Sequence, residues 1–314
     1  MPAKPLIGLI RNDRSHRNER SKAGAKLPEN VIGAAPHKRS ELPGILAGFA
    51  EKRVDCIAID GGDGTVRDVV TSGAGVFGEA WPPLVVLPNG KTNALALDLG
   101  IPTGWTLDRA MPAIAAGRTV RRPPMVIAER DSPDMQVRGF ILGAGIFNRC
   151  VQLGQRSHDL GAFNGAAVGV TTAWSVLQAF FGGADNPWRQ GSAMRIVDAS
   201  GTELGHLGGL PPHERFLLLA STIENFPSGL DPYRGVDGPI KLAVLDNARR
   251  GLLLRIGALA RGTRSAATLR RGAHLLGGEA FDIDLADSFI LDGEAFPAGN
   301  YRLTTGAKLR FIVP

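Results

Sequence analysis

The amino-acid sequence predicts two domains: an α/β domain with a parallel sheet, followed by a β-rich, sandwich-like domain. Up to residue 122, short apolar runs alternate with segments of helical spacing, which is the pattern of parallel βαβ units. After Pro124 the apolar runs become short and are separated by Gly, Pro and Asp, as in a mostly antiparallel sandwich or barrel. We therefore expect the α/β domain over residues 1–122, with a C-terminal return over 296–314, and the β-rich domain over 123–295.

The elements of the first domain follow from apolar runs and helical periodicity. The runs that predict buried strands are Pro5–Ile10, Val54–Ile59 and Leu84–Leu87. The segments that predict helices are Ser40–Glu51, Val66–Ser72, the ALALDLG stretch from Ala94 to Gly100, and Thr106–Ala116. Arg121-Arg122-Pro123-Pro124 then breaks the pattern.

The second domain is predicted from short strand-like runs with turn residues between them. These runs are Val126–Arg130, Val137–Leu142, Arg195–Val197, Phe216–Ala220, Lys241–Leu245, Phe281–Leu285 and Ser288–Leu291. Two stretches depart from the strand pattern: a predicted helix over Phe163–Phe181, and an arginine-studded segment over Ala248–Leu259.

The composition is that of a globular protein, with 44% hydrophobic and 21% charged residues, and it excludes a disordered chain. The net charge of +6 suits a polyanionic partner such as a nucleotide, a nucleic acid or an anionic membrane, although it equally fits a merely basic protein. Cys56 lies in an apolar run, so we expect a buried thiol and a reducing compartment. No apolar run reaches the ~18–20 residues of a membrane span, so we expect a soluble or peripheral protein.

The first chemical motif is Gly61-Gly62-Asp63-Gly64-Thr65, where a predicted strand turns into a helix. Glycines at such a turn let backbone N–H groups approach a phosphate, and the helix N-terminus adds positive potential. Because a carboxylate repels phosphate, Asp63 indicates a bridging Mg²⁺. The alternative is a tight turn with a capping aspartate.

The second motif, Pro88-Asn89-Gly90-Lys91-Thr92-Asn93, follows the next predicted strand. Turns at the carboxyl ends of neighbouring parallel strands converge on the crevice where such sheets bind ligands. Lys91 offers a charge for phosphate oxygens, while Thr92 and Asn93 offer neutral donors. Alone, Pro-Asn-Gly is an ordinary turn.

The third motif is Asp292-Gly293-Glu294, which follows an apolar run late in the chain. Phosphoryl transfer to an alcohol needs one carboxylate near the acceptor hydroxyl and another that helps to hold metal or nucleotide. Asp292 and Glu294 could supply them. Asp-Gly is also the commonest hairpin turn, so the structural interpretation stays open.

Together these three motifs resemble the diacylglycerol kinase catalytic family, which includes bacterial diacylglycerol kinases and the sphingosine and ceramide kinases. The resemblance covers nearly the whole chain. Asn12 and Ser15 match two positions of the family's Asn-Pro-x-Ser-Gly, and Ile141–Asn148 resembles its glycine-rich segment. Asp237 resembles the aspartate of a later Asp-Gly segment. Where the family has Gly-Thr-x-Asn, this chain has Gly-Lys-Thr-Asn, so the threonine is displaced by one position.

The resemblance implies a nucleotide domain related to that of NAD kinases and phosphofructokinases, with ATP and Mg²⁺ between the domains. It implies that Asp292 is the general base, with Asp63 the next candidate, and that Glu294 contacts nucleotide or metal. Asp63 is the implied ligand of the Mg²⁺ that accompanies ATP, and Asp237 matches one ligand of a second, structural Mg²⁺ that some bacterial members hold. The implied ATP-binding residues are Asn12, Gly61, Gly62, Asp63, Gly64, Thr65, Gly90, Lys91, Thr92, Asn93 and Glu294.

The expected activity is therefore phosphoryl transfer to a lipid hydroxyl, on diacylglycerol, ceramide or a sphingoid base, by a cytoplasmic enzyme at the inner face of the membrane. Arg249, Arg250 and Arg255 interleave with leucines, which favours contact with an anionic bilayer. A packed, solvated helix is the alternative. The oligomeric state is open, a homodimer included, and no motif indicates nucleic acid.

Two other functions compete with this expectation. An NAD kinase-like small-molecule kinase shares Gly-Gly-Asp-Gly, but it does not need the late Asp-Gly-Glu, and its Asn-Glu pair is absent after the second glycine turn. A non-catalytic relative that binds nucleotide or anionic lipid would not need Asp63, Asp292 and Glu294 together.

Overall fold

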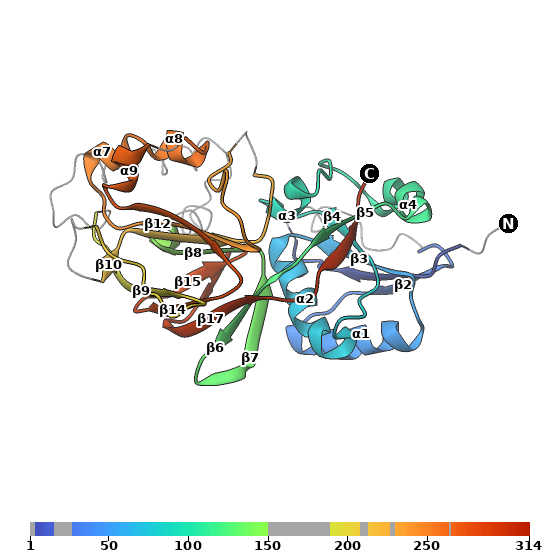
Figure 1. Cartoon of the computed structure of the whole chain (residues 1–314). Coiled ribbons are helices and arrows are strands. Elements are labelled where there is room, and N and C mark those ends of the chain that lie inside the picture. Colours follow the sequence, from blue (N-terminus) through green and yellow to red (C-terminus); the bar gives the residue numbers. More distant parts are fainter. Residues whose placement is uncertain (1–3, 16–26, 150–188, 208–212, 227–229, 264) are drawn as a thin grey trace.

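The computed structural model describes residues 4–15, 27–149, 189–207, 213–226, 230–263 and 265–314. Figure 1 shows two lobes side by side: an α/β domain that holds the N-terminus, and a β-rich domain at the other end of the molecule. The C-terminal strand returns to the α/β domain. This arrangement agrees with the two domains expected from the sequence.

The α/β domain is built on a six-stranded sheet in the order β2-β1-β3-β4-β18-β5. Strands from β2 to β18 pair in parallel with their neighbours, and β5 pairs antiparallel with β18. The strands are β1 (Ile7–Arg11), β2 (Val31–Ala34), β3 (Cys56–Gly61), β4 (Leu84–Pro88), β5 (Thr119–Arg122) and β18 (Leu309–Ile312). The helices are η2 (Arg39–Glu41), α1 (Leu42–Glu51), α2 (Asp63–Phe77), α3 (Ala94–Asp98) and α4 (Leu107–Ala116).

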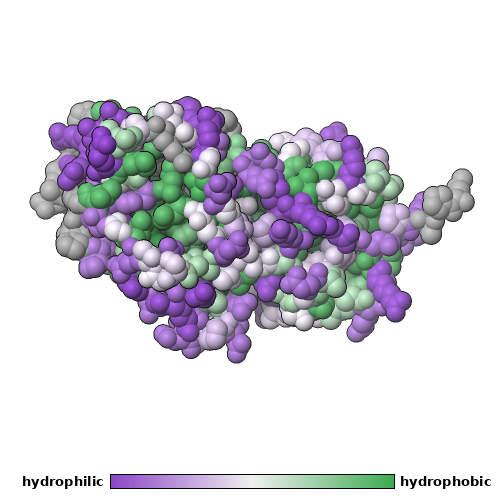
Figure 2. Space-filling model, viewed as in Figure 1, coloured by the Kyte–Doolittle hydropathy of each residue, from purple (hydrophilic) through white to green (hydrophobic). Residues whose placement is uncertain are grey.

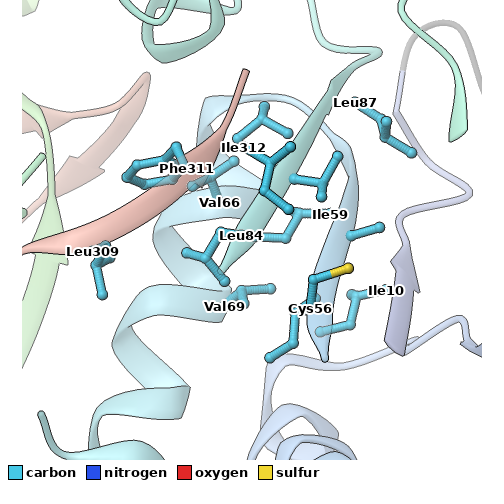
Figure 3. Packing of buried hydrophobic residues seen from close by; sticks show 14 of the residues in the cluster. Ile10, Cys56, Ile59, Val66, Val69, Leu84, Leu87, Leu309, Phe311 and Ile312 are labelled. Carbon is cyan, nitrogen blue, oxygen red and sulfur yellow. The ribbon is translucent and has the colours of Figure 1, made fainter. Parts of the chain in front are cut away.

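The central strands of this sheet are buried along nearly their whole length, because the sheet is covered by helices. Figure 3 shows residues of β3, β4, α2 and β18 that meet in one apolar cluster, among them Cys56, Ile59, Leu84, Leu87, Val66, Val69, Phe311 and Ile312. Cys56 is a buried free thiol, as expected, and burial raises the pKa of Cys56 to about 12. Cys150 lies outside the described residues.

The sheet is mixed, which corrects the expectation of a wholly parallel one. The Arg121–Arg122 segment, expected to end the pattern, forms β5 instead. Arg122 can be buried there because its guanidinium pairs with the buried carboxylate of Asp98, Nε to Oδ2 at 2.7 Å. The partner of β5 is β18, from the far end of the chain.

The β-rich domain consists of two six-stranded sheets, in the orders β10-β9-β14-β17-β6-β7 and β13-β12-β11-β8-β15-β16. Their inner faces share one apolar core, so the domain is sandwich-like, as expected. The strands of the first sheet are β6 (Met125–Glu129), β7 (Ser132–Gly139), β9 (Ser192–Asp198), β10 (Glu214–Arg215), β14 (Phe281–Leu285) and β17 (Gly299–Thr305). Those of the second are β8 (Ile141–Gly145), β11 (Leu217–Ser221), β12 (Ile240–Leu245), β13 (Ala273–Gly278), β15 (Phe289–Leu291) and β16 (Glu294–Phe296).

The chain returns to the α/β sheet later than expected. Strand β17 still pairs with β14 and β6 inside the sandwich, with Tyr301 and Leu303 buried in its core. The return therefore comes with β18, beyond Thr305, and not from residue 296.

Three short helices follow β12: α7 (Arg250–Leu253), α8 (Ile256–Ala260) and α9 (Ala266–Leu269). The first two replace the single arginine-studded segment expected over Ala248–Leu259. The helix expected over Phe163–Phe181 lies outside the described residues. Among the helices that the structure describes, none has the length and apolar character needed to span a membrane.

Candidate active site

A cleft of about 540 Å³ lies where the α/β domain meets the β15–β16 hairpin of the β-rich domain. Its walls come from the carboxyl ends of the parallel strands β1, β3 and β4, where α/β sheets bind their ligands, and from the hairpin turn. All three sequence motifs contribute to it. The lining residues are Asn12, Arg14, Ser15, Arg39, Gly62, Asp63, Gly64, Thr65, Arg67, Asp68, Gly90, Lys91, Thr92, Asp292 and Glu294.

The two glycine turns touch each other. A Cβ atom on Gly62 would lie 2.9 Å from Cα of Gly90, and a Cβ on Gly90 would overlap the backbone of Gly62 even more closely. Both positions therefore need glycine for packing. The predicted convergence of the two motifs is confirmed by this contact.

The side chain of Asp63 joins the two turns. Its carboxylate accepts hydrogen bonds from the backbone N–H groups of Ala94 (2.9 Å) and Leu95 (3.1 Å), at the start of α3. Burial raises the pKa of Asp63, although these N–H groups favour the charged form. Asp63 thus ties the start of α2 to the element that follows the second glycine turn.

The remaining predicted nucleotide-binding residues divide into supporting and exposed ones. Asn12 donates to the hydroxyl of Thr65 at 2.9 Å, and Gly61 leaves room for that hydroxyl. Asn93 closes the second turn by bonding both the N–H and the carbonyl of Gly90, each at 2.9 Å. The side chains of Lys91 and Thr92 are exposed at the edge of the cleft.

Asp292 lies in the two-residue turn of the β15–β16 hairpin, where Leu291 pairs with Glu294. Asp292 and Gly293 both have positive φ, 47° and 86°, as a type I′ turn requires. The Asp292 carboxylate accepts hydrogen bonds from the N–H groups of Phe140 (3.0 Å) and Ile141 (3.0 Å). The structural and functional interpretations of Asp-Gly therefore do not exclude each other.

The pKa of Asp292 differs from that of an ordinary aspartate. Burial raises the pKa of Asp292 to about 7, and the nearby charge of Asp63 adds to this effect, against the backbone N–H groups and Arg67. A carboxylate with a pKa near neutral pH can exchange a proton under physiological conditions.

Glu294 belongs to a charge cluster with two arginines. Its Oε2 accepts from Nη2 of Arg39 and from Nη2 of Arg67, and Asp68 accepts from both arginines as well. Burial works against ionisation of Glu294, but the hydrogen bond from Arg39 and the charge of Arg67 lower the pKa of Glu294 overall. Glu294 is thus an ionised carboxylate that pairs with two arginines at the cleft, and its expected contact with nucleotide or metal stays a prediction.

Asp237 is not part of this site. It is exposed in the loop before β12, and it does not line the cleft. Within the described residues, no group of three or more His, Cys, Asp or Glu side chains is arranged to hold a metal ion. Asp237 was expected at a second, structural Mg²⁺ and not at the nucleotide site, and that role stays a prediction.

Residues 26–125 match the family model of the diacylglycerol kinase catalytic domain. This match spans about a third of the chain, and over that part the sequence is similar to the diacylglycerol kinase catalytic-domain family. No curated protein matches the chain.

The fold resembles crystal structures of diacylglycerol kinases from Bacillus anthracis str. Sterne. One, provisionally assigned as a diacylglycerol kinase, is similar with a TM-score of 0.65 at 16% identity, over 99% of this chain and 98% of that one. Another diacylglycerol kinase structure from the same organism has a TM-score of 0.61, also at 16% identity, over 99% and 98% of the two chains. At 16% identity, the similarity to these structures establishes the fold alone.

The part that matches the diacylglycerol kinase catalytic domain contains both glycine turns and Asp63. It does not contain Asn12, Asp292 or Glu294, whose place in the site rests on the geometry described above.

Sequence analysis missed Arg39 and Arg67, which join the α/β domain to Glu294 on the other side of the cleft. Arg67 is 1% exposed; its Nη1 donates to the carbonyl of Leu291 at 3.1 Å, and its guanidinium lies 5.5 Å from the ring of Phe296. It thereby fastens α2 to the hairpin of the other domain. The one signal in the sequence is its position, on the helical turn that begins at the glycine motif.

Proposed function

We propose that this protein is an ATP-dependent lipid kinase that transfers the γ-phosphate to the primary hydroxyl of a neutral lipid. The observation that carries the proposal is the position of Asp292, which faces Asp63 and the glycine turns across the cleft. A nucleotide on the turns and an acceptor beside the hairpin would meet between these two carboxylates.

The residues of the cleft fit a nucleotide. Gly62 and Gly90 admit no side chains, so the backbone of both turns stays accessible, and the N-terminus of the 15-residue helix α2 points positive potential at the same place. The exposed cations Arg14, Arg39 and Lys91 stand around it. We propose that these groups hold the phosphates of ATP.

The carboxylates fit a divalent cation. Mg²⁺ in kinases is usually held by one or two carboxylates together with substrate phosphates. Asp63 and Asp292 lie close enough for the charge of one to raise the pKa of the other, and a cation would relieve that repulsion. We propose that Asp63 would hold Mg²⁺ together with the phosphates of ATP, and that the bound ion would neutralise the charge of the transferring phosphoryl group, while Asp292 stays free to act as the base.

We assign to Asp292 the role of accepting the proton of the lipid hydroxyl. Each carboxylate oxygen has two lone pairs, so the bonds from Phe140 and Ile141 leave room for a further donor. A pKa of about 7 lets Asp292 accept the proton as the new P–O bond forms. Glu294 acts indirectly, because it holds Arg39 and Arg67 in place.

The test is an incubation of the protein with labelled ATP, Mg²⁺ and mixed micelles that contain diacylglycerol, ceramide or a sphingoid base. We expect one lipid to be phosphorylated, and the wild-type rate to depend on Mg²⁺. Phosphorylation of NAD in place of any lipid would reassign the protein as a small-molecule kinase. Binding of ATP without any product would identify a non-catalytic relative.

A further inference from the structure

Residues 248–271, the segment between β12 and β13, cover one side of the β-rich domain and are here called the α7–α9 cap. The three helices lie together along the top of this domain in Figure 1. The segment contributes nothing to the catalytic cleft. Its structure therefore needs a separate explanation.

The cap is anchored firmly at its two ends. The N–H of Asp246 donates to the carbonyl of Gly272 at 2.8 Å, and Nδ2 of Asn247 donates to the carbonyl of Arg271 at 2.9 Å. The buried carboxylate of Asp246 also bonds Arg215, and it lies 2.6 Å from Nε2 of His274. The cap is therefore held at both ends by polar contacts with the β-rich domain.

The apolar side chains of the cap point in two directions. Leu252 is fully buried, and Leu253 and Leu259 pack with it against the end of the sandwich. Leu254 is 71% exposed and Ile256 39% exposed. Inward packing therefore accounts for only part of the leucine-rich sequence.

The charge around these exposed residues has one sign. From Asn247 to Gly278 the sequence has seven arginines and no aspartate or glutamate. Arg249, Arg255 and Arg261 are exposed and form no ion pair within the part of the chain that the structure describes. Asp231, on the neighbouring loop, is paired with Arg234. Figure 2 shows strongly hydrophilic side chains beside hydrophobic ones over this side of the β-rich domain.

We propose that the α7–α9 cap docks on the surface of an anionic lipid bilayer. The arginines would meet lipid phosphates, while Leu254 and Ile256 would enter the boundary between headgroups and acyl chains. A nucleic acid would satisfy the arginines but offers no apolar phase to Leu254. The purpose of docking, delivery to a lipid substrate, rests on the proposed function, but the docking itself is measured without turnover.

The first experiment compares vesicle binding of the full chain and two triple variants, by flotation at low salt. Arg249→Gln, Arg255→Gln and Arg261→Gln together should weaken binding to vesicles with 30% phosphatidylglycerol by about a hundredfold. The matched control, Lys52→Gln, Arg118→Gln and Lys308→Gln, removes the same charge from exposed positions of the α/β domain and should bind nearly as wild type. Equal loss in both variants would overturn the proposal, as would tighter binding to duplex DNA than to these vesicles.

The second experiment does not depend on removing charge. An environment-sensitive fluorophore is attached at Leu254→Cys or, as control, at Met135→Cys, both in a Cys150→Ser background. Met135 is 69% exposed, nearly as much as Leu254, but lies on β7 away from the cap. Anionic vesicles should shift the emission to the blue at position 254 alone. A shift at both positions, or at neither, would contradict docking through the cap, whether or not the protein proves to be a kinase.

Discussion

Replacing Asp292 with Asn should affect activity and stability in opposite directions. Asparagine keeps the shape of the side chain but cannot accept a proton, so ATP should still bind while kcat falls by about 10²–10⁴-fold, the usual effect of losing a general base. In the wild type, kcat should rise with pH through about 7, where Asp292 loses its proton. The variant should lack this limb of the pH profile.

The stability effect follows from the same pKa. Because folding raises the pKa of Asp292 from 3.8 to about 7, the folded state binds more protons between these values, and wild-type stability falls as pH rises through this window. At about 1.4 kcal/mol per pKa unit, ionisation costs at most about 4 kcal/mol above pH 7. Asp292→Asn removes that cost but places an amide N–H₂ against one backbone N–H. We therefore expect a net gain of about 1–2 kcal/mol at pH 8, and none at pH 4.

The assay measures initial rate, ATP affinity by calorimetry and thermal melts at both pH values, all on one preparation. Asp237→Asn is the control, because Asp237 is exposed and outside the cleft. If the Asp292 variant retained more than roughly a tenth of wild-type turnover, Asp292 would be a turn residue only, and Asp63 would be the next candidate base. A variant as stable as wild type at pH 8 would refute the raised pKa.

Three further substitutions test the cleft. A Cβ atom on Gly64 would have no neighbour closer than 3.8 Å, so Gly64→Ala should raise stability by about 0.4–1 kcal/mol but weaken ATP binding at least tenfold by calorimetry. Gly75→Ala, in the same helix and facing open space, should stabilise equally and leave ATP affinity unchanged. Gly90→Ala must push the adjoining glycine turn aside, so a melt should show a loss of about 1–3 kcal/mol. Arg67→Met should lower the free energy of unfolding by about 2–3 kcal/mol. This is less than the loss expected for a fully buried ion pair, because Glu294 is 39% exposed. An unchanged melting temperature would exclude Arg67 as a link between the domains.

The glycine turns could be found from sequence because their signals are local. A continuous apolar run that ends in Gly-Gly-Asp-Gly indicates a buried parallel strand followed by a helix, and a second apolar run, which ends in Pro-Asn-Gly, follows one strand later. Parallel topology then places both turns at one edge of the sheet. The contact between Gly62 and Gly90 is what that argument requires.

The missed features depend on contacts between distant segments. On helical periodicity Arg67 would be assigned to solvent, but the β15–β16 hairpin covers it and supplies a carbonyl and a carboxylate. By composition, Arg121-Arg122 would be assigned to a loop. It forms a strand because Asp98 neutralises the charge of Arg122 and β18 pairs with this segment. No local pattern in the sequence carries that information.

The Asp-Gly turn shows why a structural and a catalytic interpretation can both hold. A positive φ at Asp292 is tolerated by Asp, Asn and Gly, so the hairpin restricts the residue types before any chemistry does. The same backbone directs the carboxylate onto the N–H groups of Phe140 and Ile141, and Gly139 makes room for it, since a Cβ there would lie 2.5 Å from Oδ2. Asn-Gly suits a type I′ turn at least as well as Asp-Gly does. Asp292→Asn therefore preserves the hairpin while it removes the proton acceptor, whereas alanine would disturb both, and only the asparagine variant can assign a loss of turnover to the chemistry.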